Sequence, residues 1–479
     1  MKLLASLLFL LFFSLHALLF GELFAEHFYI HKNLLFFAEK ALLALDGRPP
    51  RLENLGFVYP PLGFVPFLLL HEPLLVSAVM GSLFSLLLVL FVLRERPRDI
   101  LPLALVLFNP LYVFLATQRF EVLTFYYLLV FSVFFAVLHI QTQYSLYAFI
   151  SGLLFGLTFF ADFRSLYISP FFALGIFLST TSRELSYRIS ILMVKLTPVL
   201  FFFLGWLYLN WVFLEDPFHF VKSPYSFLRS EPKALEVVSV SGSLWGSFRF
   251  MLSFLLQTLP LIFPYLVVLF QLRTSRVLYS IPLYVFYLLP LFFYYFSVYS
   301  SQFFPSFYAS VLFLLFALVF RKANVVSGGK LFTFSMFVSF VSAFFLPLQS
   351  KEVNERFFLK SFFGAKTDKE LSLEEDIRVS MLIKEYNCKK TLADDAYSFP
   401  VVYFSKEPGR FVLQYNYEFY TYMSNPWLHA DCLLLFTKGR GDALSFHFRR
   451  AREGFLQGYY LVHQGSKYML YKRVGYDPE

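Results

Sequence analysis

Long apolar runs broken by short polar clusters fill the chain from Leu3 to Leu348, whereas the residues from Ser350 onward have ordinary globular composition. A transmembrane helix needs about 20 consecutive apolar residues to cross the hydrocarbon core. By this measure the sequence predicts about eleven spans, at residues 3–20, 74–93, 100–117, 122–139, 145–161, 166–180, 196–214, 249–270, 278–297, 305–320 and 331–348.

This pattern predicts an α-helical polytopic membrane protein with two regions, a transmembrane domain at 1–349 and a small soluble α/β domain at 350–479. Hydrophobic residues make up 58% of the chain and charged residues 15%. Soluble domains hold about 45–50% apolar and about 25% charged residues, and a soluble fold could not bury this much apolar surface. The run that follows Met1 and Lys2 resembles a signal peptide but lacks a small-residue cleavage site, so we expect a retained first helix.

Basic residues mark alternate loops between the expected spans. Cytoplasmic loops of membrane proteins are enriched in Lys and Arg, and with a cytoplasmic N-terminus the inside loops hold Arg94, Arg96, Arg98, Arg183, Arg188, Lys195, Arg273, Arg276, Arg321, Lys322 and Lys330. We therefore expect a multi-pass protein of the inner (plasma) membrane whose C-terminal domain is extracytoplasmic. The net charge of +9 forms no basic stripe, which argues against a nucleic-acid partner.

Two outside loops are long enough to build a site. The first, 21–60, contains a helix-like stretch from Asn33 to Leu45, and the apolar run 62–70 that follows is too short to cross. Such a run lies along the outer interface or dips into the membrane, where irregular backbone must be buried in protein or line a cavity. The second, 215–248, is a candidate mobile lid over the same cavity.

The C-terminal region predicts a short, partly parallel sheet. An amphipathic stretch, 371–386, comes first; strand candidates end at Asp394 or lie at 410–415, 432–437, 459–463 and 468–473, and a helix is expected at 442–453. Gly465 and Ser466 predict a hairpin between the last two strands. The Asp394-Asp395 pair could contact an acceptor, but a turn or cap is the favoured interpretation. A disulfide between Cys388 and Cys432 requires an extracytoplasmic tail and neighbouring strands, and the sequence leaves it open.

Paired opposite charges interrupt two apolar hairpins on the expected outer face. Arg119 and Glu121 lie between two spans, and Asp162 and Arg164 lie between the next two. Polar loop tips would explain each residue taken alone, but ionisable residues within a hydrophobic region are costly and indicate function. A carboxylate can deprotonate an acceptor hydroxyl, and a guanidinium can bind a phosphate leaving group through two hydrogen bonds.

No motif demands a cofactor. The chain has no glycine-rich phosphate loop and no Walker sequence. His27 and His31 lie four residues apart, but without a third ligand we interpret them as a surface pair rather than a metal site. A divalent cation remains open.

Several short motifs follow one another in the first 180 residues. They are Leu45-Asp46-Gly47-Arg48-Pro49, Tyr59-Pro60-Pro61-Leu62, Asn109-Pro110 ahead of Glu121, and Gly152-Leu153-Leu154-Phe155-Gly156-Leu157 before Arg164. Together they resemble the membrane-embedded GT-C glycosyltransferases, in particular the bacterial branch related to lipopolysaccharide-core galacturonosyltransferases and protein mannosyltransferases.

The resemblance implies a GT-C-like fold and transfer of a hexosyl or uronosyl group from a polyprenyl-phosphate donor to an extracytoplasmic lipid, glycan or protein acceptor. The family carries an essential acid in the first outside loop, where residues 31–33 of this chain read His-Lys-Asn. Glu26, or Glu22, is therefore expected to substitute as the catalytic base from a turn or two earlier. Glu121 stands at a second acidic position where the family usually has Asp, and is expected to act as acceptor contact or supporting base.

The resemblance also assigns binding residues. We expect Arg119 and Arg164 to bind the donor phosphate, with Asp162, Tyr59 and Arg48 as further substrate-binding residues. Two other functions stay open. A non-enzymatic flippase or transporter of lipid-linked sugars would be expected to show inverted repeats and mid-membrane charges, and a catalytically inactive envelope scaffold would explain the missing Asp in the first loop.

Overall fold

The computed structural model describes residues 2–55, 57–93, 99–166, 168–170, 172–173, 184–223, 244–272, 307–322, 329–350, 352–365, 371–414, 416–437 and 442–475. The chain divides into two compact units. The helical unit comprises Met1–Leu18, Phe57–Gly63 and Ser77–Ala365, and the α/β unit comprises Leu19–Gly56, Phe64–Val76 and Lys366–Glu479. The expected boundary at residue 350 thus differs from this division, because most of the first outside loop belongs with the C-terminal region.

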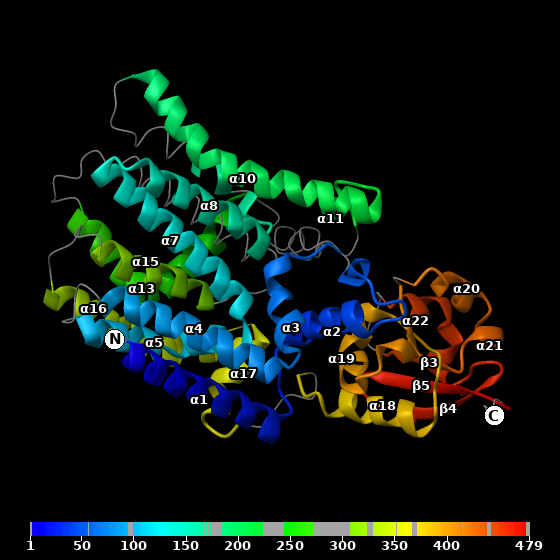
Figure 1. The fold of residues 1–479 in the computed structure, drawn as a ribbon. Coiled ribbons are helices and arrows are strands. Elements are labelled where there is room, and N and C mark those ends of the chain that lie inside the picture. Colours follow the sequence, from blue (N-terminus) through cyan, green and yellow to red (C-terminus); the bar gives the residue numbers. More distant parts are fainter. Residues whose placement is uncertain are drawn as a thin grey trace. The chain divides into compact units, whose positions relative to one another are not determined.

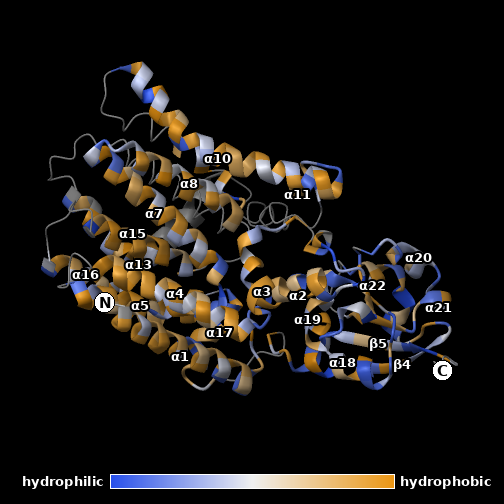
Figure 2. Ribbon diagram, viewed as in Figure 1, coloured by the Kyte–Doolittle hydropathy of each residue, from blue (hydrophilic) through white to orange (hydrophobic). Residues whose placement is uncertain are grey.

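The described part of the helical unit consists mainly of apolar helices. Figure 2 shows hydrophobic residues over most of the surface of α1, α4, α5 and α10. The helices of this part of the chain are α1 (Lys2–His27), α4 (Pro73–Leu93), α5 (Ile100–Leu107), α6 (Pro110–Gln118), α7 (Phe120–Thr142), α8 (Ser145–Ala161), α10 (Leu185–Leu214), α11 (His219–Lys222), α13 (Leu244–Leu272), α15 (Ser310–Lys322), α16 (Gly329–Phe345) and α17 (Val353–Ser361), with 3-10 turns η2 (Pro61–Gly63), η5 (Phe307–Ala309) and η6 (Leu346–Gln349).

Five of the described helices are long and apolar enough to cross a membrane, and a bent pair would make six. The protein is therefore a helical membrane protein, but the described residues do not support the prediction of about eleven spans. The expected span 100–117 is α5 and α6, bent by 56°, because Asn109 caps α6 and Pro110 begins it. The span expected at 145–161 is α8, whose 17 residues are short of a full crossing. The span expected at 278–297 lies outside the described residues, as does most of 166–180.

Two glycines allow α8 to pack closely on α10. A Cβ at Gly152 would lie 2.1 Å from the carbonyl oxygen of Lys195, and one at Gly156 would lie 2.6 Å from the ring of Phe202. Small residues four apart are a general device for close helix packing in membranes. Part of the motif at 152–157 is thus explained by packing alone.

A buried ion pair joins the start of α5 to the end of α15. Arg321 donates to both carboxylate oxygens of Asp99, at 2.8 and 2.7 Å. Asp99 follows one expected inside loop, and Arg321 begins another. The pair places these two helix ends together, in agreement with the expected alternation of sides.

The α/β unit is built on a five-stranded sheet of order β2-β1-β3-β5-β4. The first three of these strands run parallel and β5 and β4 form an antiparallel hairpin, which confirms the expected partly parallel sheet. The strands are β1 (Thr391–Ala393), β2 (Phe411–Val412), β3 (Cys432–Phe436), β4 (Tyr459–Gln464) and β5 (Tyr468–Arg473). Figure 1 shows β3, β5 and β4 beside α18 (Glu374–Glu385) and α19 (Asp395–Ser405).

Both faces of the sheet are covered. Successive strand residues point to opposite faces, so Leu434 packs on the side of α18 and α19, whereas Leu433 packs toward α20 (Phe419–Ser424) and α22 (Ala443–His447). Cys388 and Cys432 form a disulfide, with their Cα atoms 5.8 Å apart. The pairing that the sequence left open is therefore present.

Helix α2 (Lys32–Asp46), which confirms the helix expected at 33–45, is part of the same core. Leu43 belongs to the apolar cluster that contains Val401 of α19 and Leu434 of β3, and the rings of Phe36 and Phe399 meet edge to face with centroids 5.5 Å apart. The run expected near the interface forms α3 (Val65–Leu70). The first outside loop is therefore a structural layer of the C-terminal fold.

The sequence misjudged three elements of this unit. The helix expected at 442–453 breaks at Phe448, whose non-helical ψ of 59° separates α22 from the 3-10 turn η8 (Arg449–Glu453). The strand expected at 410–415 keeps only the two residues of β2. The sequence did not predict helix α19, because it contains strand-forming residues such as Val402 and because Pro400 lies inside it.

Candidate functional site

The two expected pairs of opposite charges meet in the helical unit. Helices α7 and α8 form an antiparallel hairpin, held in part by a hydrogen bond from Ser132 Oγ to the carbonyl oxygen of Ser151, so the start of α7 lies beside the end of α8. Arg119, Glu121, Asp162 and Arg164 are all buried. We call these four residues the charge cluster.

The pair at the end of α8 is joined by several hydrogen bonds. Asp162 is the residue that ends α8, and its Oδ1 accepts hydrogen bonds from the backbone N–H and Nε of Arg164, both at 2.9 Å. Its Oδ2 accepts from Arg164 Nη2 at 2.6 Å. This pair stabilises the turn after α8 and leaves the Asp162 carboxylate little capacity for another partner.

The pair at the start of α7 is held more loosely. Arg119 lies between α6 and α7 and donates to Glu121 Oε1 through Nε alone. Glu121 Oε2 is buried and accepts no hydrogen bond from any described residue. The Nη atoms of Arg119 also have no hydrogen bond among those residues, so the guanidinium keeps the two donors that suit a planar anion.

Tyr126, one and a half turns into α7, connects the two pairs. Its side chain is fully buried and lies within electrostatic range of Arg119, Asp162 and Arg164. Its hydroxyl has no hydrogen-bond partner among the described residues. Buried polar atoms are nearly always paired, so the Tyr126 hydroxyl and Glu121 Oε2 are two groups of this region with hydrogen-bonding capacity left for a ligand.

Two residues that the sequence did not single out complete this region. The ring of Tyr308, in η5, lies 5.6 Å from the Arg119 guanidinium, and the backbone N–H of Tyr308 donates to Glu355 Oε1 at 2.5 Å. Burial, and next the charge of Glu352, raise the pKa of Glu355 to about 8. Residues 305–320 were expected to be an ordinary span and 350–479 a separate domain, and the polar sequence around Glu355 gave no signal that could have drawn attention to it.

The segment that carries Tyr59 packs against the same hairpin. Phe57 belongs to one apolar cluster with Phe159 and Phe163, which flank the end of α8. The 3-10 turn η2 contacts α7 and α8. Tyr59 therefore lies on a segment that packs beside the charge cluster. Among the described residues, no other expected binding residue outside the cluster lies on such a segment of the helical unit.

The remaining expected residues belong to the α/β unit. Glu22 and Glu26 are exposed on the last turns of α1, and Arg48 is exposed after α2. His31 is buried and caps α2 by accepting the backbone N–H of Asn33, so the interpretation as a surface pair with His27 is wrong. The described residues contain no group of three side chains able to hold a metal ion.

A second group of charges is buried in the α/β unit. Lys40 of α2 donates to Asp395 of α19, and its Nζ lies 3.4 Å from Glu39 Oε2. All three side chains are almost completely buried. Burial, followed by the nearby Asp395 carboxylate, raises the pKa of Glu39 well above its usual value. Asp395 therefore holds α2 against α19 through an ion pair.

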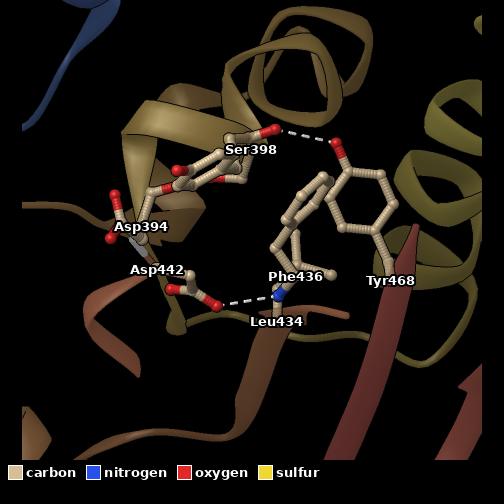
Figure 3. A pocket seen from close by; sticks show the side chains of 7 residues that line it. Asp394, Ser398, Leu434, Phe436, Asp442 and Tyr468 are labelled. Carbon is tan, nitrogen blue, oxygen red and sulfur yellow. Dashed lines mark hydrogen bonds between the residues drawn. The ribbon is translucent and has the colours of Figure 1, made fainter. Parts of the chain in front are cut away.

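The α/β unit also has a shallow hollow at the carboxyl ends of β1 and β3 (Figure 3). Asp394, at its edge, accepts hydrogen bonds from Ala396 N, Gln414 Nε2 and Ala443 N. Asp442 similarly accepts from Phe436 N, drawn in Figure 3, and from Leu444 N. The favoured interpretation of Asp394 as a cap is confirmed, and both carboxylates are occupied by structural contacts.

The lid expected at 215–248 lies largely outside the described residues.

Comparison of the chain with protein-family models, curated proteins and solved structures finds no match.

Proposed function

We propose that the protein is a GT-C-like glycosyltransferase that moves a sugar from a polyprenyl-phosphate donor to an extracytoplasmic lipid, glycan or protein acceptor, at the charge cluster. One observation carries the proposal. A buried arginine whose Nη atoms donate to no described residue lies next to a buried carboxylate oxygen that accepts from none of them, in a unit made mainly of apolar helices. An anion and a hydroxyl are the two ligands that such an arrangement suits.

In this reaction Arg119 binds the donor phosphate through its Nη atoms. Glu121 Oε2 accepts the proton of the acceptor hydroxyl, and the acceptor oxygen forms a bond to the anomeric carbon. The bond between that carbon and the phosphate oxygen breaks, and the polyprenyl phosphate leaves with the bonding electrons. Arg119 balances the charge that develops on the leaving phosphate.

The observed burial favours Glu121 over the two glutamates that the sequence placed first. A general base needs a defined position and a site that excludes bulk water. Glu121 is only 7% exposed, and its neighbours are fixed helices, whereas Glu22 and Glu26 are exposed at the end of α1. We therefore assign the base to Glu121 and keep the two exposed glutamates as control positions.

Two features support a reaction on the extracytoplasmic face. Because α2 and the C-terminal sheet share one core, the first outside loop and the C-terminal region are on the same side of the membrane. The Cys388–Cys432 disulfide suits an oxidising compartment. Both agree with a cytoplasmic N-terminus and an even number of crossings between α3 and α18.

The proposal is tested by following transfer of radiolabelled sugar from a panel of polyprenyl-phosphate sugars into envelope fractions. Glu121→Gln should lower transfer by about 10²–10⁴-fold, the usual contribution of a general base. Glu22→Gln and Glu26→Gln should retain the wild-type rate. Transfer lost in Glu26→Gln but kept in Glu121→Gln would move the base to the first loop, and no transfer from any donor by folded wild type would refute the enzyme.

A further inference from the structure

We propose that Tyr308 and Glu355 are positioning residues of the phosphate site, in which Glu355 holds the backbone of Tyr308 and the ring of Tyr308 orients the Arg119 guanidinium. This inference rests on the proposed role of Arg119. It adds to the site two residues that lie far from Arg119 in the sequence, on η5 and α17.

The contact between Tyr308 and Arg119 fixes a side chain that would otherwise be free to turn. The side chain of Arg119 donates one hydrogen bond to a described residue, from Nε to Glu121. A ring 5.6 Å from the guanidinium carbon adds a cation–π contact. With Nε and one face engaged, the Nη atoms are left as the part of Arg119 that can meet an anion.

The ring of Tyr308 packs in an aromatic group of the helical unit. Its centroid lies 6.0 Å from that of Phe114 in α6, and Phe114 in turn packs against Phe358 of α17 with centroids 5.1 Å apart. Tyr308 is almost completely buried. Packing against Phe114 and burial therefore restrict the position of the ring.

Glu355 fixes the backbone that carries this ring. Its Oε1 accepts the N–H of Tyr308 at 2.5 Å, and its Oε2 accepts the hydroxyl of Ser350 at 2.9 Å. Glu352 caps α17 by accepting the N–H of Glu355 and also lies within electrostatic range of Arg119. The first turn of α17 thus connects η5 to the arginine by both packing and charge.

The alternative is that Tyr308 and Glu355 only stabilise the helix bundle. The helical unit provides a matched control for this, because Phe332 of α16 lies 4.5 Å from the guanidinium of Arg321 and is fully buried. Loss of the Phe332 ring removes a buried aromatic side chain and its arginine contact from the same unit. It should lower stability without affecting a phosphate site.

The test is binding of farnesyl phosphate to the full-length protein in lipid nanodiscs, measured as a dissociation constant by calorimetry. Loss of a cation–π contact predicts that Tyr308→Leu weakens binding about 3–30-fold. Tyr308→Phe, which keeps the ring, and Phe332→Leu should bind within about twofold of wild type. Arg119→Gln should remove most of the affinity.

A second arm keeps the inference testable if Tyr308→Leu fails to fold. Because the pKa of Glu355 is raised to about 8, its carboxyl loses a proton between pH 7 and 9, where the phosphate is already largely ionised. The new charge lies beside the backbone of Tyr308 on η5 and beside Glu352 on its own helix, and Glu352 is within electrostatic range of Arg119. Farnesyl phosphate should therefore bind about threefold or more weakly at pH 9 than at pH 7, and Glu355→Gln should abolish this difference.

The outcomes separate this inference from the proposed function. If Arg119→Gln loses binding while Tyr308→Leu and Glu355→Gln behave as wild type, including the pH dependence, the positioning role is wrong and the phosphate site stands. If binding follows the expected pattern but no donor sugar is transferred, the positioning role stands and the glycosyltransferase does not. Wild-type protein that does not bind farnesyl phosphate overturns both.

Discussion

Replacing Lys40 with methionine tests whether the first outside loop is part of the C-terminal fold. The Lys40 ammonium is 1% exposed, donates to Asp395, and lies between it and Glu39. Lys40→Met keeps the apolar stem of the side chain but leaves the Asp395 carboxylate buried without its cation. Removing one partner of a buried pair costs about 3–5 kcal/mol.

Glu39→Gln is the matched variant at the neighbouring position. Burial and the nearby Asp395 carboxylate raise the pKa of Glu39 well above its usual value, and the variant replaces its carboxyl with an amide of the same shape. We expect a loss below about 1 kcal/mol. The difference between the stability losses of the two variants therefore measures the effect of charge in this buried group. It does not measure how sensitive α2 is to substitution in general.

The measurement is pulse proteolysis of the solubilised protein across a urea gradient, with the C-terminal fragment followed by immunoblot. Lys40→Met should move the midpoint to markedly lower urea and lower the melting temperature of the α/β unit by about 6–20 °C, since 1 kcal/mol corresponds to about 2–4 °C for a unit of this size. An unchanged midpoint for the C-terminal fragment would refute the packing of α2 on α19, and equal losses in both variants would refute the view that the Lys40–Asp395 ion pair is the main electrostatic contact of this group.

Three further predictions concern stability and topology. Burial raises the pKa of Asp394 to about 6 from 3.8, so the folded unit retains a proton that the unfolded chain loses between pH 4 and 6; its stability should fall as pH rises through this window, and Asp394→Asn should flatten that dependence in thermal melts. Gly152→Val should disrupt the α8–α10 contact and lower the yield of folded protein in size-exclusion chromatography, whereas Gly205→Val, where a Cβ meets no atom within 4 Å, should not. Cys388 and Cys432 should react with a membrane-impermeant maleimide on intact cells only after reduction, and labelling without reductant would contradict the disulfide.

The sequence predicts the membrane class and most of the C-terminal strands because each depends on a local pattern. Apolar runs reveal α4 and α7, and β5 occupies the expected residues 468–473. The number of transmembrane spans is harder to predict from the sequence, because the length of each helix depends on where the chain bends. Asn109 and Pro110 divide one expected span into two helices at 56°, and a window of average hydrophobicity does not register such a break.

The charge cluster was accessible to sequence reasoning because its four residues interrupt adjacent apolar hairpins. Tyr308 and Glu355 were not, because their importance comes from contacts with Arg119 and with each other across many residues of sequence. The sequence also does not separate Glu26 from Glu121 as candidate bases, since the two residues look equivalent along the chain. Exposure on α1 and enclosure at the start of α7 distinguish them only in three dimensions.

The central claim is that Glu121 takes the acceptor proton while Arg119 holds the donor phosphate. Its most direct test is a single-turnover experiment in nanodiscs in which the donor is bound first and the acceptor is then mixed in. For Glu121→Gln we predict donor binding within about threefold of wild type and a transfer rate reduced by at least about 10²-fold. Transfer by Glu121→Gln at the wild-type rate, once the donor is bound, would contradict the account.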